Sequence, residues 1–531
     1  MHPSQLLGRG RAPAVLVVSA ALLAGVTAPA GADGPVGSDH TADAAAITPR
    51  TSFTMAVDGS SGLTAKGKAI PNLDIVKATV RTYYNATNGV ADKTSSPYVS
   101  EVKALLDAQA AYLDSAYASV TAAGKVPAIV FDTDDTTLLT YDLKDGGMGF
   151  GSDAALQDAW VQEQRFPATP GMVSFVNAAA AKGFAVFGIT GRKDDKRAAT
   201  LANLAKVGYT AFTPSGYFTR WTGEPGSQKP SYITCATASC TTVEYKAGTR
   251  RHIESDLADP SGKRYDIVLN VGDQWSDLRG GYADRVLKLP NPLYHVPSPN
   301  LPGVHEPALA PKTQFTMQPD GSSGRTVGGE SIPNVEAVMD TIRAYYDAEN
   351  GTAARRGSAF VKELKAKTRK VAAKIKTQCR KVRTKPGRNP AVVFDVDDTL
   401  LWSYDLLDKG SDFAGDAALR EEWVQKKRYP SVPGMAKMVR KARKGGCVVI
   451  AISERDVDEA TATRKNLNRR YNHAFSKRNF YIADDKAAAR EQIKKQRRLR
   501  ILWNVGDQPA DLLGGHAEHR FQVPNPTYYL P

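Results

Sequence analysis

Short apolar runs alternate with amphipathic stretches twice along the chain. The runs are "AIVF", "FAVFGI" and "DIVLNV" between residues 128 and 271, and "AVVF", "CVVIAI" and "RILWNV" between 391 and 505. Runs of this length that are apolar at every position are typical of strands buried on both faces of a parallel sheet. Between them lie helical patterns such as "GMVSFVNAAAAKG". The alternation predicts an α/β fold with helices on both faces of the sheet.

Apolar residues at helical spacing also precede the first run of each half. Val99, Val102, Leu106, Ala110 and Leu113 would share one face of a helix, and Val361, Leu364, Ala372 and Ile375 repeat the phase. These stretches predict a helical extension on the N-terminal side of each sheet.

Longer motifs show that the two halves are copies. The repeated segments are "TMAVDGSSG" (54) and "TMQPDGSSG" (316), "DAALQDAWVQ" (153) and "DAALREEWVQ" (416), "NVGDQWSDL" (270) and "NVGDQPADL" (504), and "PNPLY" (290) and "PNPTY" (524). Because their order is conserved between the halves, we predict two homologous domains at 51–300 and 313–531, joined by a Pro-rich linker at 301–312.

The first 32 residues differ from the rest. A short basic segment precedes the apolar "APAVLVVSAALLAGV", and small residues follow up to Ala32. This order predicts a secretory signal peptide at 1–32 that is removed, followed by a linker at 33–50. A membrane anchor is the alternative, but the apolar run is shorter than the roughly 20 residues of a spanning helix. We expect a secreted protein without a membrane span.

Composition adds a strongly uneven charge. The 531 residues carry a net charge of +15, with 42% hydrophobic and 24% charged residues, as in ordinary globular proteins. Residues 352–390 hold 14 Lys or Arg and one Glu. We interpret this segment first as a solvated helix face. Contact with nucleic acid or another polyanion is the alternative.

The four cysteines suit an exported protein with few disulfides. Cys235 and Cys240 lie in "CATASC", within an insertion that only the first copy has, and we expect them to form a disulfide. Cys379 falls on an apolar helix stripe and Cys447 opens an apolar run. For this pair, two buried thiols and a bridge both remain open.

Acidic residues follow the first apolar run of each copy. Asp132 and Asp134 stand two residues apart, as do Asp395 and Asp397, so each pair needs a cation or a proton to offset its repulsion. The third run is followed by further carboxylates: Asp273 and Asp277 in the first copy, Asp507 and Asp511 in the second. Carboxylates without Cys or His favour Mg²⁺.

Groups suited to a phosphate accompany these carboxylates. The second run ends with Thr190 in "ITGR" and Ser453 in "ISER", and a lysine lies before the third run, at Lys246 or Lys486. Each feature alone has an ordinary explanation, because Asp pairs cap turns and most lysines are solvated. The full set, ordered alike and present twice, instead predicts two phosphate sites at the carboxyl ends of the strands.

At these residues the sequence resembles the haloacid dehalogenase (HAD) superfamily, and is most similar to its secreted acid phosphatases of class B and class C. The resemblance rests on D-x-D-x-T at Asp132–Thr136 and Asp395–Thr399, and on G-D-x-x-x-D ending at Asp277 and Asp511. It implies two tandem Rossmannoid domains. Only 58 residues separate Asp132 from Thr190, so each cap should be small or minimal.

The resemblance also implies roles. Asp132 and Asp395 would attack phosphorus, and Asp134 and Asp397 would act as acid and base. Thr190, Lys246, Ser453 and Lys486 would bind the phosphoryl group. About one Mg²⁺ per domain would be held by Asp132, Asp134 and Asp273, or by Asp395, Asp397 and Asp507. Asp277, Asp511, Arg192 and Arg455 would support these groups.

The expected function is that of a secreted, Mg²⁺-dependent acid phosphatase with two sites, acting on small phosphorylated substrates such as nucleotides or sugar and aryl phosphates. The alternative is a non-catalytic or half-catalytic protein that binds a phosphorylated ligand or a polyanion on the same scaffold. One departure bears on this choice, because Gly191 of the first copy is Glu454 in the second. Aromatic residues near the sites (Tyr141, Trp160, Trp402, Tyr404 and Trp423) could stack on a substrate, although core packing is the simpler interpretation.

Overall fold

The computed structural model describes residues 70–221, 223, 229–233, 240–294, 296, 332–385 and 389–530. The expected signal peptide, both expected linkers and Cys235 lie outside these residues. The domain boundaries and the Cys235–Cys240 disulfide therefore stay predictions. None of the described helices is both long and apolar enough to cross a membrane.

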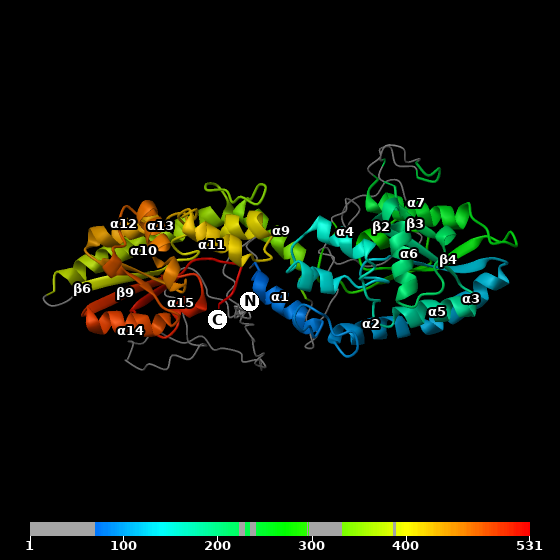
Figure 1. Ribbon diagram of the computed structural model, residues 1–531, viewed down its shortest axis with the longest axis horizontal. Coiled ribbons are helices and arrows are strands. Elements are labelled where there is room, and N and C mark those ends of the chain that lie inside the picture. Colours follow the sequence, from blue (N-terminus) through cyan, green and yellow to red (C-terminus); the bar gives the residue numbers. More distant parts are fainter. Residues whose placement is uncertain are drawn as a thin grey trace, which may run out of the picture. The chain divides into compact units, whose positions relative to one another are not determined.

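Each half of the chain forms a five-stranded parallel sheet (Figure 1). The first sheet has the order β3-β2-β1-β4-β5, and the second, related by the repeat, has the order β10-β9-β6-β7-β8. All neighbouring strands are parallel. The strands are β1 Val126–Phe131, β2 Ala185–Lys193, β3 Tyr217–Arg220, β4 Tyr265–Gly272, β5 Arg285–Lys288, β6 Asn389–Asp395, β7 Val448–Ser453, β8 Phe480–Ile482, β9 Leu499–Gly506 and β10 His519–Gln522.

Helices cover both faces of each sheet, as the sequence predicts. Those of the first repeat are α1 Leu73–Tyr83, α2 Pro97–Asp107, α3 Ala110–Ala122, α4 Ala154–Gln162, α5 Met172–Lys182, α6 Arg197–Lys206, α7 Thr242–Ser255 and α8 Trp275–Leu278. Those of the second are α9 Val335–Tyr346, α10 Ala359–Arg383, α11 Ala417–Gln425, α12 Met435–Gly445, α13 Ala460–Arg470, α14 Lys486–Gln496 and α15 Pro509–Leu512.

The central strands alternate their side chains between two cores. In β1, Ile129 and Phe131 belong to the core that also contains residues of α3, α5 and α6, whereas Ala128 and Val130 pack with residues of α7. The second repeat divides in the same way: α10, α12 and α13 pack on one face of its sheet and α14 on the other. Burial on both faces explains why these strands are continuous apolar runs.

The repeated "DAAL" motif marks a helix start. Asp153 and Asp416 precede α4 and α11, and each carboxylate accepts a hydrogen bond from the backbone N–H three residues later, at 3.0 and 2.9 Å. Such N-caps satisfy donors that the first helical turn leaves free. In each repeat, the elements between the first and second strands are a π-helical turn (Asp142–Gly147 or Leu406–Gly410), the helix α4 or α11 and the helix α5 or α12, so no large cap is present there.

Two features differ from the sequence expectations. The edge strands β3, β5, β8 and β10 are only three or four residues long, and the apolar runs predicted only the three central strands of each sheet. The helical stripe from Val99 to Leu113 is carried by two helices, because α2 ends at Asp107 and α3 begins at Ala110, whereas α10 is one helix of 25 residues.

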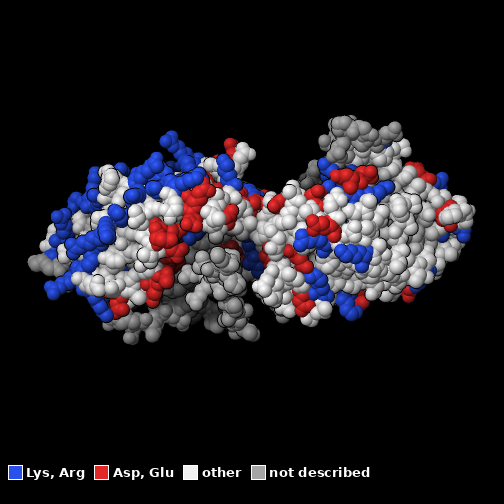
Figure 2. All heavy atoms as spheres, viewed as in Figure 1, with Lys and Arg blue, Asp and Glu red and all other residues white. Residues whose placement is uncertain are grey.

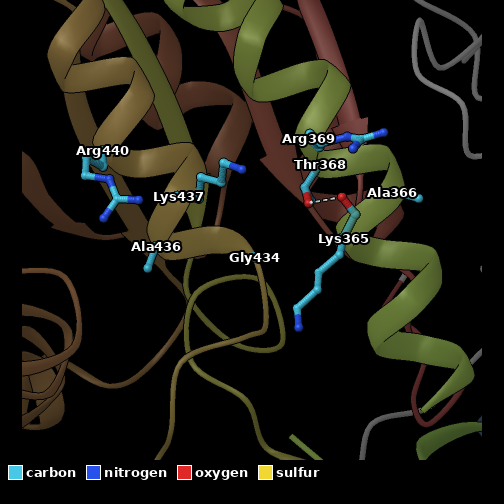
Figure 3. Close-up of a pocket in the computed structure, with 8 residues that line it drawn as sticks. All are labelled: Lys365, Ala366, Thr368, Arg369, Gly434, Ala436, Lys437 and Arg440. Carbon is cyan, nitrogen blue, oxygen red and sulfur yellow. Dashed lines mark hydrogen bonds between the residues drawn. The ribbon is translucent and has the colours of Figure 1, made fainter. Parts of the chain in front are cut away.

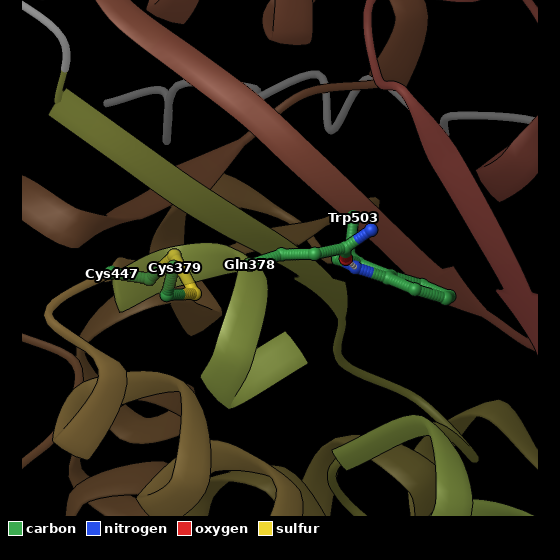
Figure 4. The surroundings of a disulfide bond; sticks show 4 residues. All are labelled: Gln378, Cys379, Cys447 and Trp503. Carbon is green, nitrogen blue, oxygen red and sulfur yellow. Dashed lines mark hydrogen bonds between the residues drawn. A yellow bond between two sulfur atoms is a disulfide. The ribbon is translucent and has the colours of Figure 1, made fainter. Parts of the chain in front are cut away.

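The second repeat contains a disulfide between Cys379 of α10 and Cys447, just before β7 (Figure 4). The Cα atoms lie 5.3 Å apart and the bond spans 68 residues of sequence. The sequence left open whether Cys379 and Cys447 are two buried thiols or a bridge, and the structure contains the bridge. Closing a loop of this size stabilises a fold by about 4 kcal/mol in the chain-entropy account.

Candidate active sites

The first-repeat site is built on residues that follow β1 and β4. Asp132 comes directly after β1, and Lys246 reaches it from α7. The Lys246 Nζ donates to Oδ1 of Asp132 at 2.5 Å and to Oδ1 of Asp277 at 2.7 Å. All three side chains are buried. The lysine therefore joins the carboxylates after the first and third predicted strands.

The second-repeat site reproduces this arrangement. Lys486 lies at the start of α14, and its Nζ donates to Oδ1 of Asp395 at 2.7 Å and also to Oδ1 of Asp511. The structure thus brings Lys246 and Lys486 into matching positions, although their sequence distances from Asp273 and Asp507 differ.

The glycine of each "GDQ" motif allows the turn after β4 or β9 to close tightly. A Cβ on Gly272 would lie 2.5 Å from the Cβ of Asp277, and one on Gly506 would lie 2.3 Å from the Cβ of Asp511, so neither position can hold a larger residue without movement. The Asp277 carboxylate accepts the backbone N–H of Gln274 at 2.8 Å. The motif therefore fixes Asp277 and Asp511 in place.

Burial disfavours the charged form of the clustered carboxylates. It raises the pKa of Asp132 and of Asp395 well above the usual value, and the neighbouring carboxylates of Asp277 and Asp511 add to the shift. Burial, with the same neighbours, raises the pKa of Asp273 to about 7 and that of Asp507 to about 8. Each site therefore contains more carboxylates than its single lysine can offset in their charged form, and a further cation would favour that form.

This charge excess fits a divalent cation. Carboxylate oxygens of Asp132, Asp273 and Asp277 lie within 4.8 Å of one another, as do those of Asp395, Asp507 and Asp511. The donors are all oxygen atoms, which is the ligand type of Mg²⁺. In this arrangement Asp277 faces the other carboxylates directly, whereas the side chain of Asp134, expected near the metal, turns to an arginine.

Arg192 and Arg455 hold the second carboxylate of each pair. Nε of Arg192 donates to Oδ2 of Asp134 at 3.1 Å, and Nε of Arg455 donates to Oδ2 of Asp397 at 2.9 Å. Both arginines are buried. The sequence analysis assigned these arginines only a supporting role. In the structure they lie beside the sites and hold the carboxylates of Asp134 and Asp397.

The hydroxyl groups expected to bind phosphate lie deeper. Thr190 lies within β2, three residues before its last residue, and Ser453 is the last residue of β7. Both are fully buried, and each accepts the backbone N–H of the arginine two residues on at 3.2 Å. The first cavity is lined by Gly191, the neighbour of Thr190, and the second by Glu454, the neighbour of Ser453. The two hydroxyls are not among the lining residues.

Each cluster opens into a cavity of small-molecule size, about 310 Å³ in the first repeat and about 340 Å³ in the second. The aromatic lining is Phe166 and Tyr294 in one and Tyr429 and Tyr528 in the other. Of the aromatic residues considered from the sequence, Tyr141, Trp402 and Tyr404 are buried in the core. The simpler interpretation holds for these three.

Two asparagines of the "PNPLY" and "PNPTY" motifs are site residues that the sequence analysis did not assign. Asn291 donates to Oδ2 of Asp273 at 2.7 Å, and Asn525 donates to Oδ2 of Asp507 at 2.9 Å. The Asn291 side chain thereby orients a carboxylate of the cluster. The signal was available, because these motifs are repeated and follow the last strand of each sheet.

The N-terminal helix of each repeat contacts the same segment in the other repeat. Both repeats belong to one compact unit. Nδ2 of Asn334, the N-cap of α9, donates to the backbone carbonyl of Tyr294 at 2.8 Å, and Nδ2 of Asn72, the N-cap of α1, donates to that of Tyr528 at 2.9 Å. Glu336 of α9 also lines the first-repeat cavity. Each repeat thus supports the site of the other.

This exchange predicts crossed effects of mutation. Asn334→Ala removes hydrogen bonds to the segment that carries Asn291 and should weaken the first-repeat site several-fold, on the order of 1 kcal/mol. Asn72→Ala should do the same to the second-repeat site. The measurement is phosphate release in two backgrounds, Asp395→Asn and Asp132→Asn, in each of which only one site keeps the aspartate that is expected to act as the nucleophile. Equal losses at both sites would contradict this arrangement.

The two sites differ at one charged position. Oε1 of Glu454 lies 3.4 Å from Nζ of Lys486, so this ammonium faces three carboxylates. The matching residue, Gly191, has no neighbour within 4 Å of the place where a Cβ would stand. The second-repeat site should therefore attract a phosphate group less strongly than the first.

Exchanging these residues should exchange this property. Glu454→Gly is expected to lower KM at the second-repeat site by a factor of about five, corresponding to about 1 kcal/mol for one partly exposed charge. Gly191→Glu should raise KM at the first-repeat site by a similar factor. Glu454→Gln and Gly191→Gln are the matched controls for size. If Gly191→Gln impairs the site as much as Gly191→Glu, charge is not the cause.

A family model agrees with this site chemistry over both repeats. The model of the HAD superfamily, subfamily IIIB (acid phosphatase), matches residues 45–297 and 334–531, which is most of the chain. The chain belongs to this family. Membership confirms the HAD-like α/β fold in tandem that the sequence motifs predicted, and it supports a phosphatase activity.

The curated relatives that match this chain come from plants. The stem 28 kDa glycoprotein of Glycine max is 33% identical, vegetative storage protein 1 of Arabidopsis thaliana is 30% identical and acid phosphatase 1 of Solanum lycopersicum is 29% identical. Each match covers 32% of this chain. The matches cover 59%, 55% and 58% of the three relatives, in the same order. The match thus spans a little over half the length of each relative. A class C acid phosphatase from Bacillus anthracis with tungstate bound is a similar solved structure, with 22% identity, a TM-score of 0.31, and coverage of 42% of this chain and 86% of that one.

Proposed function

We propose that the protein is a secreted, divalent-metal-dependent phosphomonoesterase with one active site in each repeat. The observation that carries the proposal is the buried lysine that joins Asp132 to Asp277 and, in the second repeat, Asp395 to Asp511. An ammonium that stands between these carboxylates in both repeats supports binding of a phosphoryl group next to a nucleophile. Small phosphate monoesters, including nucleotides and sugar or aryl phosphates, are the substrates we infer from the cavity size.

In this proposal the reaction has two steps. An oxygen of Asp132 attacks phosphorus and the bond to the leaving oxygen breaks, giving an aspartyl phosphate; Asp134 gives the leaving oxygen a proton. Water then attacks the aspartyl phosphate while Asp134 takes a proton from it, which releases phosphate. Arg192 holds the Asp134 carboxylate in position for both steps. Asp395, Asp397 and Arg455 would act alike.

The proposed metal set combines the sequence and the structure. Asp132 and Asp273 would hold the ion in the first repeat with the backbone carbonyl of Asp134, and Asp395, Asp507 and the carbonyl of Asp397 in the second; Asp277 and Asp511 lie within reach. A bound Mg²⁺ would supply positive charge against the phosphoryl oxygens and the nucleophile. Lys246 and Lys486 would bind the phosphoryl oxygens, while Arg192 and Arg455 position Asp134 and Asp397.

A second candidate is a protein that binds a phosphorylated ligand without turnover in one or both repeats. Two observations favour it: some relatives are named as storage proteins, and Glu454 adds negative charge to the second-repeat site. This candidate uses the same cavities but needs no nucleophile. Hydrolysis of a phosphate ester distinguishes the enzyme from the binding protein.

The test is phosphate release from an aryl phosphate monoester by the purified protein. We expect turnover that stops after chelation of divalent cations and returns when Mg²⁺ is added, because the carboxylate clusters repel a phosphate dianion without a cation. Full activity after exhaustive chelation would contradict the metal dependence. Binding of phosphate without any ester hydrolysis would favour the second candidate.

A further inference from the structure

The second repeat has one strongly basic helix layer. Helix α10 contains ten Lys or Arg and one acidic residue, Glu363, α12 contains five and α13 four, and neither of the latter has an acid. All three helices pack their apolar residues on the same face of the sheet. The basic side chains are therefore left on the outer surface, and Figure 2 shows Lys and Arg gathered over this part of the molecule.

The first repeat provides an internal comparison. Its equivalent layer, α2, α3, α5 and α6, holds four Lys or Arg and three acidic residues in all. The fold and the buried stripe are the same in both repeats, so neither requires the positive charge. Lys437, Arg440 and Lys444 of α12 stand where α5 has Ser174, Asn177 and Ala181. A solvated face alone does not need this excess of one sign, which costs free energy through mutual repulsion.

The basic layer also has a recess of its own. An open cavity of about 640 Å³ lies between α10 and α12, lined by Lys365 and Arg369 on one helix and by Lys437 and Arg440 on the other. Figure 3 shows these four side chains on the two walls, with Thr368 and Gly434 between them. All four are exposed. The recess contains no acidic lining residue and is separate from the two carboxylate clusters.

We propose that this face binds the phosphate backbone of duplex DNA without reading its sequence. Helix α10 is about 37 Å long at about 1.5 Å per residue, close to the roughly 34 Å of one turn of DNA. The charge extends across several helices, which suits a wide rod better than a single narrow chain. Phe360 is the aromatic residue of α10, α12 and α13, and it is buried, so the face has no ring on which unpaired bases could stack.

The test uses the full chain and a labelled duplex, with fluorescence polarisation at several salt concentrations. We expect a Kd near 10⁻⁶ M at low salt, falling affinity as salt rises, and a log–log slope of about −0.9 for each phosphate contact. The variant K437S/R440N/K444A gives α12 the residues of α5 at three exposed positions. It should bind on the order of tenfold more weakly and lower the slope by up to about 3.

The control variant is K494A/K495A/R498N, which removes the same number of exposed charges on and just after α14, on the other face of the sheet. We expect it to bind the duplex like the unmodified chain, and we expect both variants to keep the thermal unfolding midpoint. Equal losses in the two variants would reduce the effect to net charge and overturn the proposal. So would the absence of binding at low salt, or tighter binding of single-stranded DNA or inorganic polyphosphate than of the duplex.

Discussion

The double variant Asp132→Asn, Asp395→Asn is expected to lose phosphatase activity by on the order of 10³-fold or more, whereas each single variant keeps the turnover of the other repeat. An amide in place of the nucleophile cannot form the aspartyl phosphate, and loss of a covalent nucleophile has effects of this size or larger in other hydrolases. The measurement is the steady-state rate with an aryl phosphate under saturating Mg²⁺.

Folding should not explain the loss. The pKa of Asp132 is raised because burial and Asp277 disfavour its charge, so a neutral amide there does not remove a favourable charge state. Lys246 keeps its contact with Asp277. We therefore expect Tm to stay the same or to rise. Asp107→Asn, at an exposed position, is the control for an Asp-to-Asn change and should keep full activity. A single variant that already abolishes hydrolysis would show that only one repeat is an enzyme.

Removing one metal carboxylate should empty one site and spare the other. The unmodified protein is expected to bind about two Mg²⁺ per chain. The variants Asp273→Asn and Asp507→Asn should each bind about one, and the double variant should bind none in the same concentration range. The physical reason is the charge of the cluster, because the substituted site loses one of its three clustered carboxylates. The affinity of that site for Mg²⁺ should fall by about 10- to 100-fold or more.

Isothermal titration of the metal-free protein measures this stoichiometry independently of turnover. Glu163→Gln is a suitable control, because it changes an exposed carboxylate outside both clusters. Retention of two ions by Asp273→Asn would mean that Asp132 and Asp277 suffice for the metal. Absence of metal binding by the unmodified protein would contradict the proposed role of the clusters.

The central part of each fold could be predicted because burial determines it. Strands β1, β2 and β4 are apolar at almost every position, and two-sided burial is the main reason for such runs. The edge strands β3 and β5 could not be predicted in this way, since each is only four residues long, and β5 mixes Arg285 and Lys288 with two apolar residues. Their strand conformation depends on pairing with a neighbour that the local sequence does not reveal.

The same limit applies to the sites. The clustered aspartates could be named because parallel strands end at one edge of the sheet. The side chain that contacts each aspartate could not be predicted. Asp134 pairs with Arg192, 58 positions away, and Asp273 accepts a hydrogen bond from Asn291 in the segment after β5. Contacts of Asn72 and Asn334 with the opposite repeat depend on how two complete domains pack. The sequence repeats show that both halves contain these residues, but they do not show which side chains the residues contact.

The covalent aspartyl phosphate can be trapped in a variant that completes only the first step. The variant Asp134→Asn, Asp397→Asn keeps both nucleophiles but lacks the base for the second step, and a nitrophenyl leaving group needs little protonation in the first. Acid quenching, borohydride reduction of the acyl phosphate and peptide mapping then identify the modified residues. We expect modification at both Asp132 and Asp395. Modification at neither aspartate, while the unmodified protein hydrolyses the same ester, would contradict it.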